Sequence, residues 1–279
     1  MIALSFAFLA CLSWGTSSFL AGIKSKVIPL LTLLIYSATA GLVMLLIVLG
    51  IRAEPFPRDP ALFFAVLGGA GSIFGLFCFY RGLSQGNISI VVPVSGMCAL
   101  LPLAVGLLRG EVLHPLQSLG IVAAIGGGVL VSWEKPAAGQ TNQLAKGFIP
   151  ALGAALGFGI FYVVMDFAGT VDPLWAAAIA RLTCLAFILP VVCIKRPPLT
   201  FKATHLPAVW AIGSLEGLAA FFYTTATTKG MLSLVSVISS LYPGVSILLA
   251  AIILKERLRG YQFAAVVMIV LGVSLISAF

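Results

Sequence analysis

Two side chains of opposite charge fall inside long apolar segments of this sequence. Glu216 is about ten residues into the apolar run 206–229, and Arg181 is about eight residues into the run 173–194. An ionised side chain at the centre of a bilayer costs about 2.5–3.5 kcal/mol on insertion scales, so it needs a partner, a water-filled cavity or a proton. Glu216 could therefore bind a coupling proton, and Arg181 could pair with Glu216 or bind an anionic group of a solute. The alternatives are a structural hydrogen bond for Glu216 and snorkelling to the interface for Arg181.

Aromatic and hydroxyl side chains within other apolar runs form a second group of candidates. Aromatic walls with a few hydroxyl groups suit an amphipathic organic solute. The candidates are Trp14, Tyr80, Phe158, Tyr162, Tyr223, Ser239 and Tyr242, with Ser17 as a further hydroxyl. Each of them is also explained by packing or by hydrogen bonds between helices. Glu111 and Glu256 end apolar runs beside basic residues, which fits either solvated charges or contacts of a gate.

The sequence carries no pattern that indicates an enzyme, a metal or a cofactor. His114 and His205 are the 2 histidines, and both fall at predicted helix ends. The 5 cysteines lie inside apolar runs without the spacing of metal ligands. No Ser–His pair or pair of Asp residues is expected within the membrane. An intramembrane enzyme is therefore the less favoured alternative, and we expect neither cofactor nor metal.

The elements that must position these residues are apolar helices. Of the residues, 61% are hydrophobic and 9% are charged, whereas a soluble domain carries about 25% charged residues. Lipid must surround most of such a chain, and in lipid only helices or closed barrels satisfy the backbone. Unbroken apolar runs exclude the alternating pattern of barrel strands. The ten runs are 3–22, 30–51, 61–81, 87–109, 114–133, 147–168, 173–194, 206–229, 232–254 and 259–277. They predict an all-α integral membrane protein with ten transmembrane helices.

The basic residues indicate topology rather than nucleic-acid binding. The net charge is +8, but the basic residues stand singly or in pairs between apolar runs. Of the 16 Lys and Arg, 4 fall in loops on the side of the N-terminus, 11 fall on the other side, and Arg181 lies within a helix. Because cytoplasmic loops carry the excess of Lys and Arg, this distribution predicts that both termini lie outside the cytoplasm. We expect a multi-pass protein of a bacterial cytoplasmic membrane that works as a monomer.

The second half of the chain repeats the first at an offset of 142–145 residues. The segment 71–76 matches 213–218, and Glu111, Gln117 and Gly127 match Glu256, Gln262 and Gly272. The predicted repeats are residues 1–134 and 147–279, joined by a linker at 135–146. Five helices per repeat would place the two copies in opposite orientations, and inverted copies can exchange conformations so that a midplane site faces each side in turn. This arrangement favours a transporter, and Glu216 is specific to the second repeat, where it replaces Phe74 of the first.

Several local motifs resemble the EamA-type members of the drug/metabolite transporter superfamily. They are Trp14-Gly15, the turn 254–258 followed by Gln262, and the matching Gly110-Glu111 with Gln117. The resemblance spans nearly the whole chain as two EamA-like repeats. It implies proton-coupled or facilitated movement of a small metabolite across the membrane, often as export. A lipid-linked flippase is a further alternative, and many relatives have cytoplasmic termini, the reverse of the orientation that the loop charges predict.

Overall fold

A computed structural model describes residues 1–85, 91, 94–131, 141–255 and 260–278 of the chain. In these ranges all the regular secondary structure is helical. Eight helical segments of the described residues, with 232–253 counted as one, are long and apolar enough to cross a membrane, and two shorter apolar helices lie at 94–108 and 115–130. These shorter helices stand where the sequence predicts the fourth and fifth spans. The structure therefore bears out the all-helical membrane class with eight candidate spans among the described residues, and the count of ten transmembrane helices stays a prediction.

Apart from the predicted run 87–109, most of whose first part lies outside the described residues, the helix boundaries follow the predicted runs to within a few residues, with one exception. The first half contains α1 (Ile2–Lys24), α2 (Leu30–Arg52), α3 (Phe63–Gln85), α5 (Leu100–Leu108) and α6 (Pro115–Val131). The second half contains α7 (Thr141–Gly169), α8 (Pro173–Lys195), α9 (Leu206–Thr227), α10 (Leu232–Ser239), α11 (Tyr242–Ile253) and α12 (Gly260–Ser277). Short 3-10 turns lie at Pro60–Leu62, Met97–Ala99 and Ala203–His205. Of the predicted linker, 135–140 lie outside the described residues, as does Glu256, whereas 141–146 form the first turns of α7.

The exception is the run 232–254, which the sequence predicts as one helix and which the structure divides. α10 ends at Ser239, and α11 begins at Tyr242 with Pro243 in its first turn. Proline lacks a backbone N–H, and its ring clashes with the carbonyl group four residues earlier, so a continuous helix is interrupted here. Hydropathy does not report such a break, because both halves are equally apolar.

Local sequence also explains where α8 begins. The Oδ1 atom of Asp172 accepts hydrogen bonds from the backbone N–H of Leu174 at 2.8 Å and of Trp175 at 2.9 Å. Pro173 occupies the first turn, where its missing N–H costs nothing. An acidic N-cap satisfies amide groups that would otherwise lack partners, so Asp172 fixes the start of the helix that carries Arg181.

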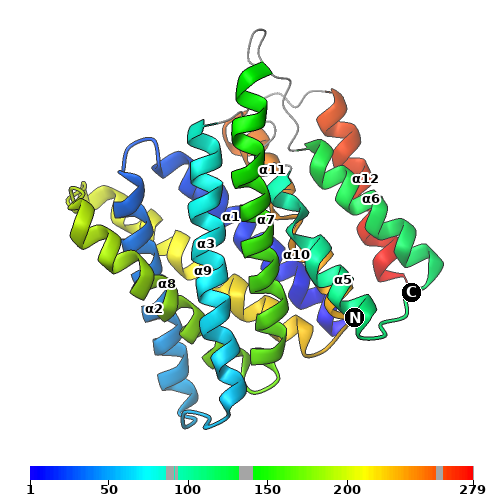
Figure 1. Cartoon of the computed structure of the whole chain (residues 1–279), viewed down its shortest axis with the longest axis horizontal. Helices are drawn as coiled ribbons and strands as arrows, with labels where there is room; N and C mark the ends of the chain where they lie inside the picture. The colour runs from blue at the N-terminus through cyan, green and yellow to red at the C-terminus, as the bar shows by residue number, and fades with distance from the viewer. Residues whose placement is uncertain (86–90, 92–93, 132–140, 256–259, 279) are drawn as a thin grey trace.

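The helices pack as pairs that join the two halves of the chain. α3 packs on α7, α1 on α9, α2 on α8 and α6 on α12. Figure 1 shows α6 beside α12 at one margin of the bundle and α2 beside α8 at the opposite margin. Glycine permits the α3–α7 contact, since a Cβ atom at Gly157 would lie 2.6 Å from the backbone nitrogen of Gly75. Without side chains at these positions, the two helices can pack closely.

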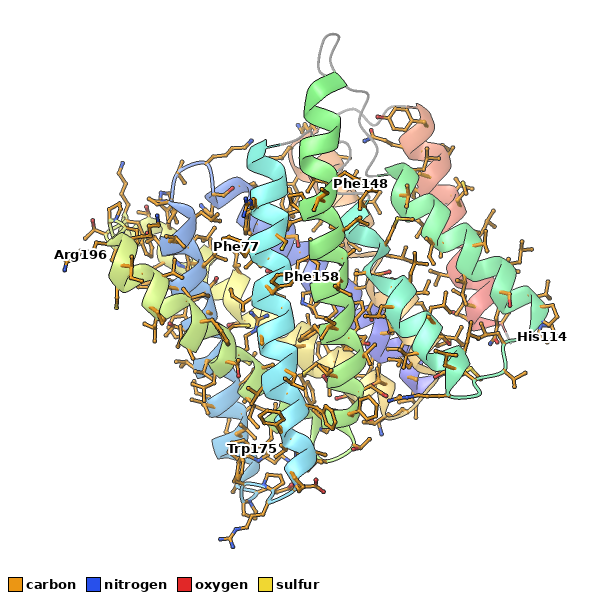
Figure 2. The ribbon with its side chains drawn as sticks, in the orientation of Figure 1. Phe77, His114, Phe148, Phe158, Trp175 and Arg196 are labelled. Atoms are coloured by element: carbon orange, nitrogen blue, oxygen red, sulfur yellow. The ribbon has the colours of Figure 1, made fainter. Side chains whose placement is uncertain are left out.

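The outer surface of the bundle is apolar, as a lipid-facing surface must be. Phe77 on α3 is 63% exposed and Val122 on α6 is 69% exposed. Figure 2 shows side chains such as those of Phe77 and Phe148 among the ribbons, and charged or polar residues such as Arg196 and His114 at the margins. Large apolar side chains are exposed on nearly every helix of the described residues, which is far more apolar surface than a soluble protein leaves uncovered and fits a membrane environment.

Candidate functional site

An ion pair lies near the middle of the helices. The Nη2 atom of Arg181 donates to the Oε2 atom of Glu216 at 2.7 Å. Arg181 is the ninth of the 23 residues of α8, and Glu216 is the eleventh of the 22 residues of α9. The side chains are 16% and 30% exposed, so both are partly accessible. The structure therefore confirms the predicted pairing of these two residues.

Ser17 brings α1, from the first half of the chain, to the same site. Its Oγ atom lies 3.0 Å from the Oε1 atom of Glu216 and 3.2 Å from the carbonyl oxygen of Ile212. Ser17 is fully buried. The two oxygen atoms of the Glu216 carboxylate thus face different partners, the Arg181 guanidinium and the Ser17 hydroxyl.

Aromatic rings lie one turn away from Ser17 along α1. The Trp14 ring centroid is 5.7 Å from that of Tyr162 and 5.9 Å from that of Tyr223. The rings of Tyr162 and Tyr223 are stacked, with centroids 4.4 Å apart. Residues three apart on a helix share a face, so Trp14 and Ser17 point toward the same region. The structure therefore gathers three of the predicted aromatic residues into one cluster, next to the face of α1 that also carries Ser17.

The polar groups of this cluster bond within the bundle. The Tyr223 hydroxyl donates to the carbonyl oxygen of Tyr162 at 2.9 Å and lies 2.9 Å from the Oγ atom of Ser236. The Ser239 hydroxyl donates to the carbonyl oxygen of Ala7 at 3.4 Å. These contacts join α10 to α1 and α9 and join α9 to α7, so in this conformation Tyr223 and Ser239 hold helices together.

The remaining predicted site residues lie at two different places. Tyr80 on α3 and Tyr242 on α11 are close enough to Glu216 for its charge to act on their phenol groups. Phe158 lies instead where α3 and α7 cross, as Figure 2 shows, and its ring packs against Gly75. Tyr80 and Tyr242 therefore lie in the neighbourhood of Glu216, whereas Phe158 contributes to the contact between helices.

Further ion pairs lie at the end of the bundle that carries the N-terminus, which we term the terminal side. The Nη1 atom of Arg109, after α5, lies 2.5 Å from the Oδ2 atom of Asp166 on α7, and its guanidinium stacks 4.0 Å from the centroid of Phe167. The Nη1 atom of Arg52, at the end of α2, lies 2.7 Å from the Oδ2 atom of Asp172. Both contacts join the first half of the chain to the second on this side.

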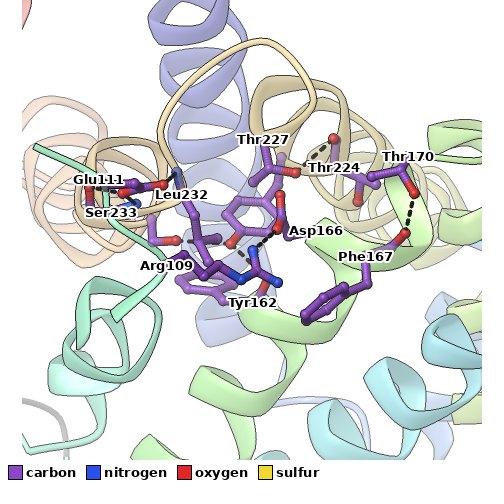
Figure 3. Close-up of polar contacts among 12 residues, drawn as sticks. Arg109, Glu111, Tyr162, Asp166, Phe167, Thr170, Thr224, Thr227, Leu232 and Ser233 are labelled. Carbon is purple, nitrogen blue, oxygen red and sulfur yellow. Dashed lines mark hydrogen bonds and ion pairs between the residues drawn. The ribbon is translucent and has the colours of Figure 1, made fainter. Parts of the chain in front are cut away.

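Glu111 makes the third contact of the terminal side, as Figure 3 shows. Its carboxylate accepts hydrogen bonds from the backbone N–H of Leu232 at 2.6 Å and of Ser233 at 3.1 Å. The hydroxyl of Ser233 donates to it at 2.5 Å. A carboxylate at a helix N-terminus meets unpaired amide groups and the positive end of the helix dipole. Glu111 of the first half therefore holds α10 of the second half and is not a solvated surface charge.

Sequence reasoning missed these contacts for a physical reason. The sequence shows that Arg109 and Asp166 lie near helix ends, but only the packing of α5 against α7 brings them together. Similarly, nothing in the local sequence of Glu111 indicates which helix it caps. Among the described residues, no group of three or more His, Cys, Asp or Glu could hold a metal ion.

The apolar helices with a polar cluster at mid-depth define a multi-pass integral membrane protein. A family model described as the EamA-like transporter family matches residues 1–133 and again residues 145–278. The chain therefore belongs to the EamA-like transporter family of the DMT superfamily and is a membrane transporter of the DMT type.

One solved structure shows the same fold. A protein known from a crystal structure is 22% identical, with a TM-score of 0.86, and the match covers 99% of this chain and 96% of that chain. No curated sequence matches the chain. The members of the EamA-like family are transporters rather than enzymes, which agrees with the non-enzymatic function expected from the sequence.

Proposed function

We propose that this protein is a secondary transporter that moves a small organic metabolite by alternating access, with Arg181, Glu216 and Ser17 at its central site. The main observation behind the proposal is the Arg181–Glu216 ion pair at mid-depth, which is hydrogen-bonded to Ser17 on α1 in the other half of the chain. Charged groups are costly at this depth and are retained where they bind ions or solutes. The aromatic cluster around Trp14 provides an apolar surface for the body of the solute.

Inverted repeats provide the mechanism of alternating access in this proposal. Suppose that α1, α2, α3 and α6 of the first half correspond to α7, α8, α9 and α12 of the second. Replacing each helix by its counterpart converts the α1–α9 contact into the α7–α3 contact and leaves the α2–α8 and α6–α12 contacts unchanged. All four contacts occur in the structure. The two matches to one family model support the same correspondence. Two copies in opposite orientations can exchange conformations, and the exchange would move the opening from one side to the other.

The contacts on the terminal side provide the closed gate of the conformation described above. Arg109–Asp166, Arg52–Asp172 and the capping of α10 by Glu111 each join the two halves there. Opening this side would require these contacts to separate. The loop charges predict that the terminal side lies outside the cytoplasm, and the proposal takes the membrane to be a bacterial cytoplasmic membrane.

Proton coupling is assigned to Glu216 in this proposal, with export as the direction of transport. The Glu216 carboxyl group contacts Arg181 and Ser17 at mid-depth, and its side chain is 30% exposed rather than sealed in the core, as exchange of a proton requires. The counterpart position in the first repeat is Phe74, so the proposal requires a single proton site rather than a symmetric pair.

Transport measurements in proteoliposomes test this function. Solutes that stabilise the purified protein in a thermal-shift screen would be offered to liposomes with and without a pH gradient. Wild type is expected to transport at least one solute with a pH-dependent rate, and Glu216→Gln is expected to lose the pH dependence. Glu54→Gln is the matched control, because Glu54 pairs with Arg52 at the surface. Unchanged rates and unchanged pH dependence in Glu216→Gln would remove Glu216 from the mechanism.

A further inference from the structure

We infer that the central site binds an organic monocarboxylate on Arg181 in exchange for Glu216, and that Glu216 takes up a proton as the solute binds. The inference rests on the proposed transport function and names the solute class for the same site. Its starting point is an ion pair in which both partners are partly exposed, 16% for Arg181 and 30% for Glu216. A solute that reaches the pair meets both charges.

Arg181 can exchange one carboxylate for another. Its guanidinium has several N–H donors in a planar fork that matches a carboxylate with two parallel hydrogen bonds. In the structure, a single atom of that fork, Nη2, donates to Glu216. Among the described residues, Glu216 is the carboxylate that pairs with Arg181. A solute carboxylate with two-point contact can therefore displace it.

Ser17 is placed to serve both protonation states of Glu216. Its hydroxyl carries a single proton but has two oxygen partners, the carboxylate of Glu216 and the carbonyl of Ile212. When Glu216 is ionised, Ser17 donates to Oε1. When Glu216 is protonated, its O–H can donate to the Ser17 oxygen, and Ser17 can turn its own proton to the Ile212 carbonyl. No hydrogen bond at Ser17 needs to be lost when the proton arrives.

Charge balance explains why the proton accompanies the solute. The empty site contains Arg181 as a cation and Glu216 as an anion. After exchange, Arg181 pairs with the solute carboxylate, and displaced Glu216 would be an unpaired anion at mid-depth, which is costly. Uptake of a proton from water converts it to the neutral acid. The site is thus neutral both with and without solute. Neither state therefore has an unpaired charge when the protein changes between its two conformations.

The surroundings favour a carboxylate with an apolar body. Trp14 lies on the same face of α1 as Ser17, and its ring neighbours that of Tyr162. A zwitterionic amino acid could pair with Arg181 and Glu216 together and would need no proton. Because Ser17 can hydrogen-bond to both the ionised and the protonated Glu216, we favour an anionic solute that binds together with a proton. Binding of a zwitterion is the alternative outcome of the test.

Binding calorimetry on the full chain in lipid nanodiscs tests the inference. Butyrate, phenylacetate and palmitate are titrated near neutral pH in two buffers of different ionisation enthalpy, beside butyramide, phenylacetamide and the zwitterion phenylalanine. We expect at least one acid to bind, its amide to bind roughly tenfold or more weakly, and about one proton to be taken up per acid bound. Palmitate against the two short acids separates a solute that enters from lipid from one that enters from water.

Variants locate the proton. Glu216→Gln is expected to bind the acid without buffer-dependent proton uptake, and Glu54→Gln is expected to retain both. Three results would each overturn the inference: no binding by any acid, equal binding of acid and amide, or acid binding without proton uptake in wild type. Binding of phenylalanine instead of the acids, with no proton, would also overturn it. The comparison of acids with amides uses wild type alone, so it does not depend on how a variant folds.

The outcomes also separate this inference from the proposed function. If a solute is transported but binds without a proton, the transport function is supported and the displacement of Glu216 from Arg181 is refuted. If an acid binds with proton uptake but does not cross the bilayer, the displacement is supported and the transport function is refuted.

Discussion

The hydroxyl of Tyr223 shows how single polar groups hold this bundle together. It lies within hydrogen-bond distance of the Tyr162 carbonyl and of Ser236, and the tyrosine is fully buried. Lipid provides no driving force for apolar side chains to associate, so close packing and hydrogen bonds between helices gain weight. At the residue scale, the central site consists of hydrogen bonds between helices and the Arg181–Glu216 ion pair.

Removal of that hydroxyl is expected to destabilise the protein. Tyr223→Phe leaves Ser236 and the Tyr162 carbonyl without this buried partner, which costs about 1–3 kcal/mol. The free energy of unfolding in mixed micelles, measured by titration with SDS, checks the effect. Tyr36→Phe is the control, because Tyr36 is 37% exposed, and its effect is expected to be small. Equal effects of the two substitutions would contradict the role assigned to the hydroxyl.

Single residues were predictable where their cost in lipid marks them. Glu216 and Arg181 stand out because each is a charge in an apolar run, and their pairing follows from the need to neutralise both. The partners of Ser17 and Glu111 were not predicted, because a serine, or a glutamate at a helix end, can lie in many environments at little cost in free energy. Their partners, Glu216 and the start of α10, depend on which helices pack together.

At the scale of helices, glycine sets the distance between α3 and α7. A Cβ atom at Gly157 would lie 2.7 Å from the Gly71 carbonyl oxygen, and backbone atoms can yield only if the helices separate. Gly157→Ala is therefore expected to destabilise the protein by about 1–3 kcal/mol. Gly22→Ala provides the matched control, since a Cβ atom there meets nothing within 4 Å. It should be neutral or stabilising by about 0.4–1 kcal/mol, and the reverse order in SDS titrations would refute this account of the contact.

The capping of α10 by Glu111 gives a second prediction for helices. In Glu111→Gln the charge is lost, and the amide cannot accept through both of its ends, so we expect a loss of about 1–2 kcal/mol in unfolding free energy. Glu54→Gln removes a surface ion pair and is expected to cost at most about 1 kcal/mol. Thermal unfolding in detergent ranks the two variants. A Glu111→Gln protein as stable as wild type would show that the capping contact does not hold the halves together.

Helix existence followed from hydropathy, but helix continuity did not. The apolar run 232–254 contains Pro243, yet a proline can kink a transmembrane helix without dividing it when its neighbours satisfy the backbone. α7 and α8 each continue through an internal proline, Pro150 and Pro190, so a proline in an apolar run does not by itself predict a division. In the same way, an apolar run does not specify a partner, so the pairing of α6 with α12 became visible only in the structure.

For the whole molecule, the distribution of charge predicts the orientation in the membrane. Ser25 lies on the side opposite the N-terminus, and Arg58 lies on the terminal side; both are exposed. In a cysteine-free background, Ser25→Cys is expected to react with an impermeant maleimide in inside-out vesicles, and Arg58→Cys in right-side-out vesicles. The opposite labelling pattern would establish cytoplasmic termini.

The most direct test of the account is the accessibility of its central site from the two sides of the membrane. Ser17→Cys, in the cysteine-free background, places a thiol beside Glu216. This thiol lies on α1, the helix of the first half that contacts Glu216 of the second half. Alternating access predicts that an impermeant thiol reagent modifies this cysteine from either side, in right-side-out and in inside-out vesicles. Modification from only one side, or from neither, would contradict the claim that one site faces both sides in turn.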